Sequence, residues 1–198
     1  MKRIAVVGGI GAGKSELSAR LSARGWPVVD ADVIARRVTI SGQPAWSALR
    51  DAFGDAVLDA DGEIDRPFLA DVVFHDSSAL ARLNRITHGP IGEEIVRELN
   101  ELDGAAAFVV LPLFRPEHRS LLSLDAVWAV MVEPATALER LCTLRGLSEA
   151  DARARLAAQM TNERRAEIVD RVIWNEGTLD ELYTAIDLAL RDEGLAYG

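Results

Sequence analysis

The segment GGIGAGKS, residues 8–15, constrains the fold more than any other stretch of this sequence. It follows the short apolar run RIAVV at 3–7, which is typical of a buried strand, and it precedes residues 14–24, whose leucines have helical spacing. Glycine tolerates positive φ, so consecutive backbone N–H groups can turn toward one point. The segment therefore predicts a strand, an anion-binding loop and a helix whose positive dipole end faces that loop.

The loop fits the pattern G-x-x-x-x-G-K-[ST], the P-loop, through Gly8, Gly13, Lys14 and Ser15. In this motif the lysine ammonium reaches the β- and γ-phosphates of a nucleotide, and the hydroxyl ligates Mg²⁺. We therefore predict a site for ATP and Mg²⁺, with Ser15 as the metal ligand. The residues predicted to bind the nucleotide here are Gly9, Ile10, Gly11, Ala12, Gly13, Lys14 and Ser15.

Other interpretations of the loop fit less well. A glycine-rich turn with a surface lysine is the simplest alternative, but it does not explain the flanking strand and helix. A dinucleotide-binding G-x-G-x-x-G loop has the wrong spacing, because Gly9, Gly11 and Gly13 alternate and a lysine follows. A GTPase would need an N-K-x-D segment, which the sequence lacks. A small phosphotransferase that closes a mobile lid over its substrates remains.

The rest of the chain alternates strand and helix patterns, which predicts an α/β fold. The runs at 105–114 and 125–134 are apolar at successive positions, as in a parallel sheet covered on both faces. Further strands are expected at 26–30 and 171–175, and 59–65 is expected to form a turn or short hairpin. Helices are predicted at 31–38, 44–53, 66–75, 78–102 with a break near Gly89–Pro90, 135–145, 148–168 and 178–192.

Composition restricts the partners and the compartment. The net charge of −9 disfavours nucleic acid, whose phosphates would be repelled. No apolar run approaches the roughly 18 residues of a membrane-spanning helix, so no membrane association is expected. Cys142 is the single cysteine, which precludes an intrachain disulfide and favours the reducing cytoplasm. The sequence does not determine the oligomeric state, and a monomer is favoured.

Two carboxylates, Asp30 and Asp32, close the strand predicted at 26–30. Ligands of open α/β sheets bind beyond the carboxyl ends of the strands, where the P-loop also lies. One carboxylate could accept a proton from an attacking hydroxyl, and the other could hold Mg²⁺ through water or cap the following helix. Arg36 lies one turn after Asp32 and could bind an anionic group, although a solvated turn would also explain these residues.

At this point the sequence resembles the dephospho-coenzyme A kinase family over residues 1 to about 190. That family transfers the ATP γ-phosphate to the ribose 3′-hydroxyl of dephospho-CoA. The resemblance implies a five-stranded parallel P-loop core (1–37, 105–145 and 170–198), a helical acceptor-binding region (about 38–104) and a lid (about 146–168). It is carried, in order, by the segments GGIGAGKS, VVDADVIARRV, ALARLNRITHGPI, LPLF, DAVWAVMVEPATALERLCTLRGLS and AAQMTNERRAEIVDRVIWNEGT.

The resemblance also implies roles for single residues. Asp32 corresponds to the catalytic base, and Lys14 and Arg36 complete the catalytic set. The acceptor site would include Asp32, Arg36 and His88. Further contacts to ATP would come from Arg140, Arg145, Arg165 and Asn175. Surface ion pairing is the alternative explanation for each of these arginines, and a structural role is the alternative for His88.

Three positions depart from the family's pattern. Glu16 stands where a threonine is usual, His88 and Pro90 are separated by a glycine, and Arg115 follows the PLF segment in place of an acidic residue. Two of the three lie on the acceptor side. This leaves two alternatives: a relative that phosphorylates another nucleoside-like or small alcohol, and an ATP-binding regulator without catalytic activity.

Overall fold

The computed structural model describes residues 1–195. The chain forms two compact units. The first consists of Met1–Val29 together with the chain from Leu102 onward, and the second is Asp30–Glu101. Each unit has its own packing and is described separately below.

The first unit is built around a five-stranded sheet in the order β2-β3-β1-β4-β5. β1 pairs in parallel with both β3 and β4, and β4 pairs in parallel with β5. The predicted α/β fold with a five-stranded parallel sheet is confirmed. The strands are β1 (Lys2–Gly8), β2 (Val28–Asp30), β3 (Ala106–Val110), β4 (Ala126–Met131) and β5 (Arg171–Trp174).

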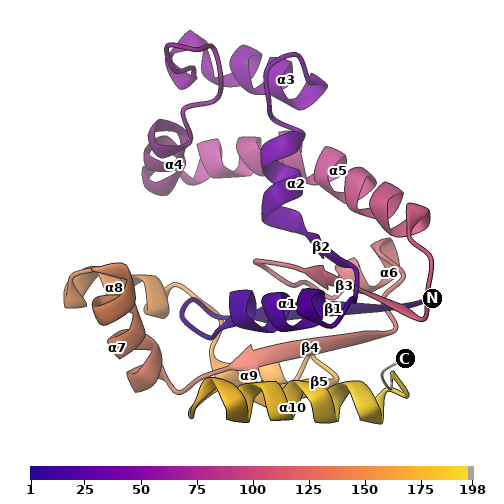
Figure 1. The fold of residues 1–198 in the computed structure, drawn as a ribbon. Coiled ribbons are helices and arrows are strands. Elements are labelled where there is room, and N and C mark those ends of the chain that lie inside the picture. The colour runs from indigo at the N-terminus through magenta and orange to yellow at the C-terminus, as the bar shows by residue number, and fades with distance from the viewer. Residues whose placement is uncertain (196–198) are drawn as a thin grey trace. The chain divides into compact units, whose positions relative to one another are not determined.

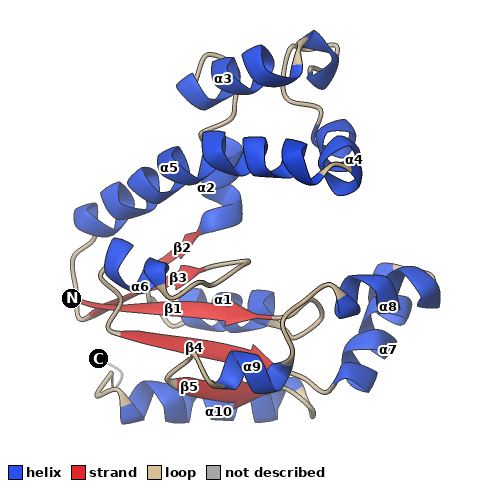
Figure 2. Ribbon diagram, turned by 180° about the vertical axis from the view of Figure 1, so that it is seen from behind, coloured by secondary structure: helices blue, strands red, loops and turns tan. Residues whose placement is uncertain are grey.

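Strands β3 and β4 are apolar at every position, as is the part of β1 at 4–7, because helices or loops cover both faces of the sheet. Ile4, Phe108 and Trp128 are completely buried on one face, where they pack with α1 (Lys14–Ala23) and α10 (Leu179–Asp192). Figure 1 shows these two helices on the near side of the sheet, and Figure 2 shows α9 (Asn162–Ala166) on the opposite side. The apolar run 105–114 is longer than β3 because residues outside the strands are also buried in this unit.

The remaining helices of the first unit are α6 (Glu117–Leu121), α7 (Pro134–Arg145) and α8 (Glu149–Ala157). The prediction of one helix over 148–168 is wrong, because α8 ends and α9 begins anew within that range. Thr161 caps α9 by accepting a hydrogen bond from the N–H of Arg164. A side chain that satisfies the first amides of a helix favours a new start over continuation.

The second unit is helical. Its elements are α2 (Ala31–Arg37), α3 (Pro44–Phe53), the short 3₁₀ helix η1 (Asp55–Val57), α4 (Arg66–His75) and α5 (Ser77–Glu101). The turn expected at 59–65 is confirmed by an antiparallel bridge between Leu58 and Ile64. The expected break at Gly89–Pro90 is wrong, because α5 continues through Pro90. Among the helices of residues 1–195, none is both long enough and apolar enough to cross a bilayer.

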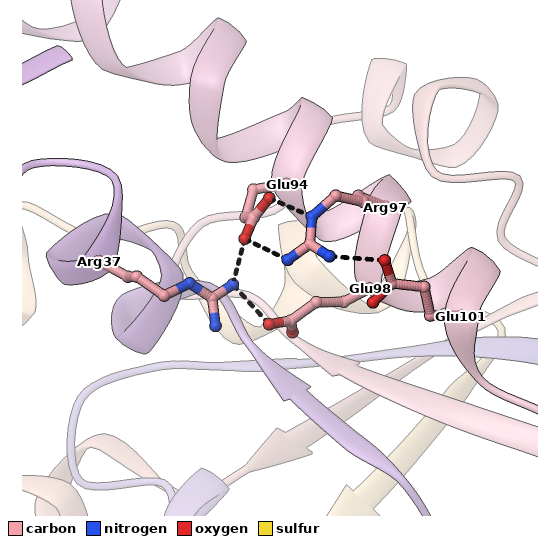
Figure 3. A network of polar contacts seen from close by, with 5 residues as sticks. All are labelled: Arg37, Glu94, Arg97, Glu98 and Glu101. Carbon is pink, nitrogen blue, oxygen red and sulfur yellow. Dashed lines mark hydrogen bonds and ion pairs between the residues drawn. The ribbon is translucent and has the colours of Figure 1, made fainter. Parts of the chain in front are cut away.

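A network of ion pairs joins α2 to α5 (Figure 3). One guanidinium nitrogen of Arg37 donates to Glu94 at 2.6 Å and to Glu98 at 2.5 Å. Arg97 donates to the same Glu94 and, at 2.6 Å, to Glu101. The network fixes α2 against the last turns of α5, and α2 carries two of the predicted site residues.

The network should make stability depend on pH in the acid range. Hydrogen bonds from Arg97, together with its charge and that of Arg37, lower the pKa of Glu94 to about 2. Because this lies below the unfolded value of about 4.3, the stabilisation is fully present above that pH and is lost as the pH falls toward 2. Glu94→Gln should therefore lower the urea concentration at the midpoint of unfolding at pH 7. The corresponding loss of unfolding free energy should be less than about 1 kcal/mol.

The measurement is urea unfolding of both proteins between pH 7 and pH 2.5, with Glu93→Gln as the control. Glu93 is the exposed neighbour of Glu94 and lies outside the network. The difference in unfolding free energy between wild type and Glu94→Gln should become smaller as the pH falls. Glu93→Gln should have the same unfolding free energy as wild type at every pH. A difference in unfolding free energy that does not change with pH would contradict an ionic origin of the stabilisation by Glu94.

Candidate functional site

The candidate site begins at the loop between β1 and α1, which has the predicted strand–loop–helix arrangement. Gly11 and Gly13 have φ of 76° and 100°, which a residue with a side chain adopts only at a cost. Gly13 is the N-cap of α1, and no side chain caps this helix. The first amides of α1 therefore remain available to an anion at the positive end of the helix dipole.

Two glycines of the loop are also required by close packing. A Cβ at Gly8 would lie 2.5 Å from the carbonyl oxygen of Val130 in β4. A Cβ at Gly13 would clash with the side-chain nitrogen of Asn175. The loop thus passes directly against the backbone and side chains at the carboxyl ends of β4 and β5.

This packing predicts the effect of Gly13→Ala. Alanine at this position would have an unfavourable φ and would also clash with Asn175. The clash should lower the free energy of unfolding by about 1–3 kcal/mol, in addition to the loss caused by the unfavourable φ. Gly25→Ala is the matched control, because Gly25 has φ of 80° and open space around its Cβ position. Thermal unfolding measures the loss of stability in each variant. Equal losses of stability in Gly13→Ala and Gly25→Ala would show that Asn175 does not restrict the loop.

Lys14 lies inside the loop. Its ammonium donates hydrogen bonds to the carbonyl oxygens of Gly8 at 2.7 Å and Gly9 at 3.2 Å. The positive charge therefore lies against backbone carbonyl oxygens at the start of the loop. Ser15 follows in the first turn of α1 and is exposed, as is Glu16.

The residue that follows β5 and a residue of α7 hold the loop in place. The buried Asn175 donates from its side-chain amide to the carbonyl oxygen of Ala12 at 2.9 Å. Arg140 donates to the carbonyl oxygen of Asn175 at 2.9 Å and to that of Gly11 at 3.4 Å. The structure thus brings together the predicted residues Asn175 and Arg140 with the loop. It leaves Arg145 exposed at the end of α7.

The segment from α8 to α9 also contacts the loop. Gln159 accepts a hydrogen bond from the N–H of Ile10 through its side-chain oxygen, at 2.9 Å. Arg165 is only 9% exposed and donates to Asn162 and to the carbonyl oxygen of Met160. Burial lowers the pKa of Arg165, although an arginine remains charged at neutral pH. Sequence reasoning overlooked Gln159, even though it lies within one of the segments that carry the family resemblance.

A cavity of about 320 Å³ opens between the loop and these elements. The loop contributes Gly9, Ile10 and Ala12 to its wall. Pro134 and the half-exposed Trp174 supply apolar surface. The cavity wall therefore combines backbone of the loop with apolar side chains, a combination that suits a nucleotide.

The other predicted residues lie in the second unit. Asp30 is the N-cap of α2 and accepts a hydrogen bond from the N–H of Asp32 at 2.8 Å. Of the two roles considered for the second carboxylate, the structure supports helix capping. Asp32 and Arg36 are exposed in the first and last turns of α2, and His88 is exposed on α5.

No group of three or more His, Cys, Asp or Glu side chains within residues 1–195 could hold a metal ion. Mg²⁺ in nucleotide sites is usually bound through one or two protein oxygens together with substrate phosphates. The Ser15 hydroxyl at the start of α1 fits such a partial site.

Comparisons with known proteins give a consistent result. The family model described as dephospho-CoA kinase matches residues 3–181. A curated dephospho-CoA kinase of Streptomyces avermitilis is 45% identical over 92% of this chain and 89% of its own length. One from Bacillus cereus is 40% identical over 96% of each chain.

Solved structures agree in fold. The protein TT1252 of Thermus thermophilus has a TM-score of 0.81 at 28% identity, covering 96% of this chain and 97% of its own. The dephospho-CoA kinase of Campylobacter jejuni has a TM-score of 0.67 at 25% identity, covering 100% and 98%. A shikimate kinase of Bacteroides thetaiotaomicron, at 15% identity, covers 98% of this chain and 99% of its own with a TM-score of 0.54, and shows likeness of fold alone.

Proposed function

Because this chain belongs to the dephospho-CoA kinase family, we propose that it transfers the γ-phosphate of ATP to the ribose 3′-hydroxyl of dephospho-CoA, giving coenzyme A and ADP. The observation that carries this proposal furthest is the loop after β1. Its helix has no side-chain cap, and the Lys14 ammonium lies among its backbone groups. A polyphosphate would exchange the contacts of Lys14 with two carbonyls for contacts with anionic oxygens.

In this proposal, the loop amides and Lys14 hold the β- and γ-phosphates of ATP. Mg²⁺, held by the Ser15 hydroxyl, would neutralise phosphate charge when bound. The cavity lined by Pro134 and Trp174 suits the planar, largely apolar base. Arg140 and Arg165 lie next to the loop and would stabilise the charge that spreads over the phosphoryl oxygens during transfer.

Asp32 would accept the proton of the attacking 3′-hydroxyl. Its place in the chain supports this role, because it comes two residues after the carboxyl end of β2, next to β3 in the sheet. Arg36, one turn further along α2, would face an anionic group of the acceptor, and His88 would contribute to acceptor binding. The enzyme acts in the cytoplasm in this proposal, which the single unpaired cysteine supports.

The test is release of ADP from ATP and Mg²⁺ with dephospho-CoA as the acceptor. Phosphorus NMR of the product should show a new 3′-phosphate monoester. Coenzyme A is the matched control acceptor, because its 3′-hydroxyl is already phosphorylated, and it should give no ADP. A panel of other alcohols tests the alternative acceptors. Binding of ATP without turnover of any acceptor would favour the regulator.

A further inference from the structure

The junction between α8 and α9, residues 158–161, lies at two cavities of the first unit. One is the cavity of about 320 Å³ beside the loop. The other has a volume of about 170 Å³ and is bounded by Gly8 and Phe114 among others. Gln159 and Met160 of the junction, together with Arg165 of α9, line both cavities. These three residues therefore lie where the two cavities reach the first half of the loop.

The junction is attached to the rest of the first unit at both of its ends. The side-chain oxygen of Gln159 accepts a hydrogen bond from the N–H of Ile10 at 2.9 Å. Asn162 donates from its side chain to the carbonyl oxygen of Val132, just beyond β4, at 2.8 Å. Arg165 in turn donates to the side-chain oxygen of Asn162 at 3.1 Å. These contacts fix the guanidinium of Arg165 relative to the loop.

The positive charge of Arg165 has no negative partner in the protein. Within residues 1–195 no carboxylate pairs with this buried guanidinium, whose hydrogen bonds go to uncharged oxygens of Met160 and Asn162. Burial is accordingly the cause of its lowered pKa. A buried charge without a partner is costly, and a bound anion would supply the missing charge.

Gln159 and Arg165 meet at the same glycine of the loop. A Cβ at Gly9 would lie 3.1 Å from the side-chain oxygen of Gln159 and 3.7 and 3.8 Å from two guanidinium nitrogens of Arg165. A carboxylate at position 159 could also accept the hydrogen bond from Ile10. Its negative charge would then attract Arg165 and repel phosphates in the loop. The amide oxygen of glutamine accepts the same hydrogen bond without a net charge.

We propose that Gln159 is a positioning residue of the nucleotide site, whose neutral amide ties the junction to the loop and leaves the charge of Arg165 for the phosphates of ATP. This inference rests on the ATP site of the proposed function and adds a requirement to it. The residue at position 159 has to accept a hydrogen bond and has to be uncharged. Gln159 acts through Ile10 and Arg165 and takes no part in the transfer itself.

The experiment measures binding of ATP and Mg²⁺ by calorimetry without an acceptor. Gln159→Glu should raise the Kd of ATP roughly 10-fold, because one negative charge is added a few ångströms from the phosphates. Its Tm without ATP should equal or exceed that of wild type, since the carboxylate still accepts from Ile10 and also attracts Arg165. The ratio of the two Kd values should fall between about 0.1 M and about 1 M KCl, as the Debye length drops from about 10 Å to about 3 Å.

Two further variants separate the charge from the hydrogen bond. Ala154→Glu is the matched control, because it adds the same charge at an exposed position of α8 outside both cavity walls. It should bind ATP as wild type does. Gln159→Leu removes the acceptor without adding a charge. It should raise the Kd of ATP roughly 2- to 10-fold, the usual effect of losing one hydrogen bond, and to the same extent at both salt concentrations.

The outcomes distinguish this inference from the proposed function. If wild type binds ATP and Gln159→Glu binds it equally tightly, the inference is wrong. A rise in Kd that Ala154→Glu shares, or that salt does not reduce, also contradicts it. In each of these cases the proposed function stands if wild type phosphorylates dephospho-CoA. A wild type that binds ATP but does not phosphorylate dephospho-CoA overturns the proposed function alone, and a wild type that does not bind ATP overturns both.

Discussion

Replacing Asp32 with asparagine is expected to lower kcat by about 10²- to 10⁴-fold, the usual contribution of a positioned general base. Asparagine has nearly the same shape but cannot accept the proton of the attacking hydroxyl. The affinity for ATP should stay close to that of wild type, since the proposed nucleotide site lies in the first unit. The fold should also be retained, because the side chain of Asp30 caps α2 by accepting a hydrogen bond from the backbone N–H of residue 32, which the substitution leaves in place.

Asp30→Asn is the matched control for this variant. Asparagine caps helices about as well as aspartate, so Asp30→Asn should keep both the stability and most of the activity. The measurements are kcat with dephospho-CoA, its pH dependence, and the Kd of ATP by calorimetry. In Asp32→Asn the acid limb of the pH profile should disappear. If the Kd of ATP rises as strongly as kcat falls, Asp32 has a structural role and is not the base.

The sequence predicted the fold well where the signal is local. The runs IAVV (4–7) and AVWAVMV (126–132) are apolar without interruption because both faces of the sheet are covered, and both fall on central strands. Two helix predictions were wrong for opposite reasons. Pro90 suggested a break, but the buried Ile95 and Leu99 hold the rest of α5 in place. The charged stretch around Met160 looked continuous, yet local capping by Thr161 divides it.

The candidate site, too, could be predicted where its residues are consecutive in the sequence. Gly8 to Ser15 could be identified because a whole binding loop lies in consecutive residues. Gln159 and Ile10 are far apart in sequence, and their hydrogen bond depends on how the segment from α8 to α9 folds back onto the loop.

Replacing Lys14 with alanine is expected to lower kcat/KM by about 10³-fold or more, because the transferred phosphoryl group would lose its main cationic contact in the loop. The free energy of unfolding should change far less than the activity. Lys14 contributes hydrogen bonds to the carbonyl oxygens of Gly8 and Gly9, each with a typical net contribution of about 0.5–1.5 kcal/mol. The clearest difference should therefore appear when ATP is added. At 100 times its Kd, ATP stabilises a binding protein by about 2.7 kcal/mol.

Thermal unfolding with and without ATP and Mg²⁺ separates the two effects. Wild type should gain stability with ATP, whereas Lys14→Ala should gain little at the same concentration. Lys2→Ala is the control, since Lys2 is the other lysine of the chain and pairs at the surface with Glu193. It should respond to ATP as wild type does. A Lys14→Ala protein that is stabilised fully by ATP would show that the ammonium does not contact the phosphates, because a polyphosphate that loses a direct contact with a cation binds less tightly.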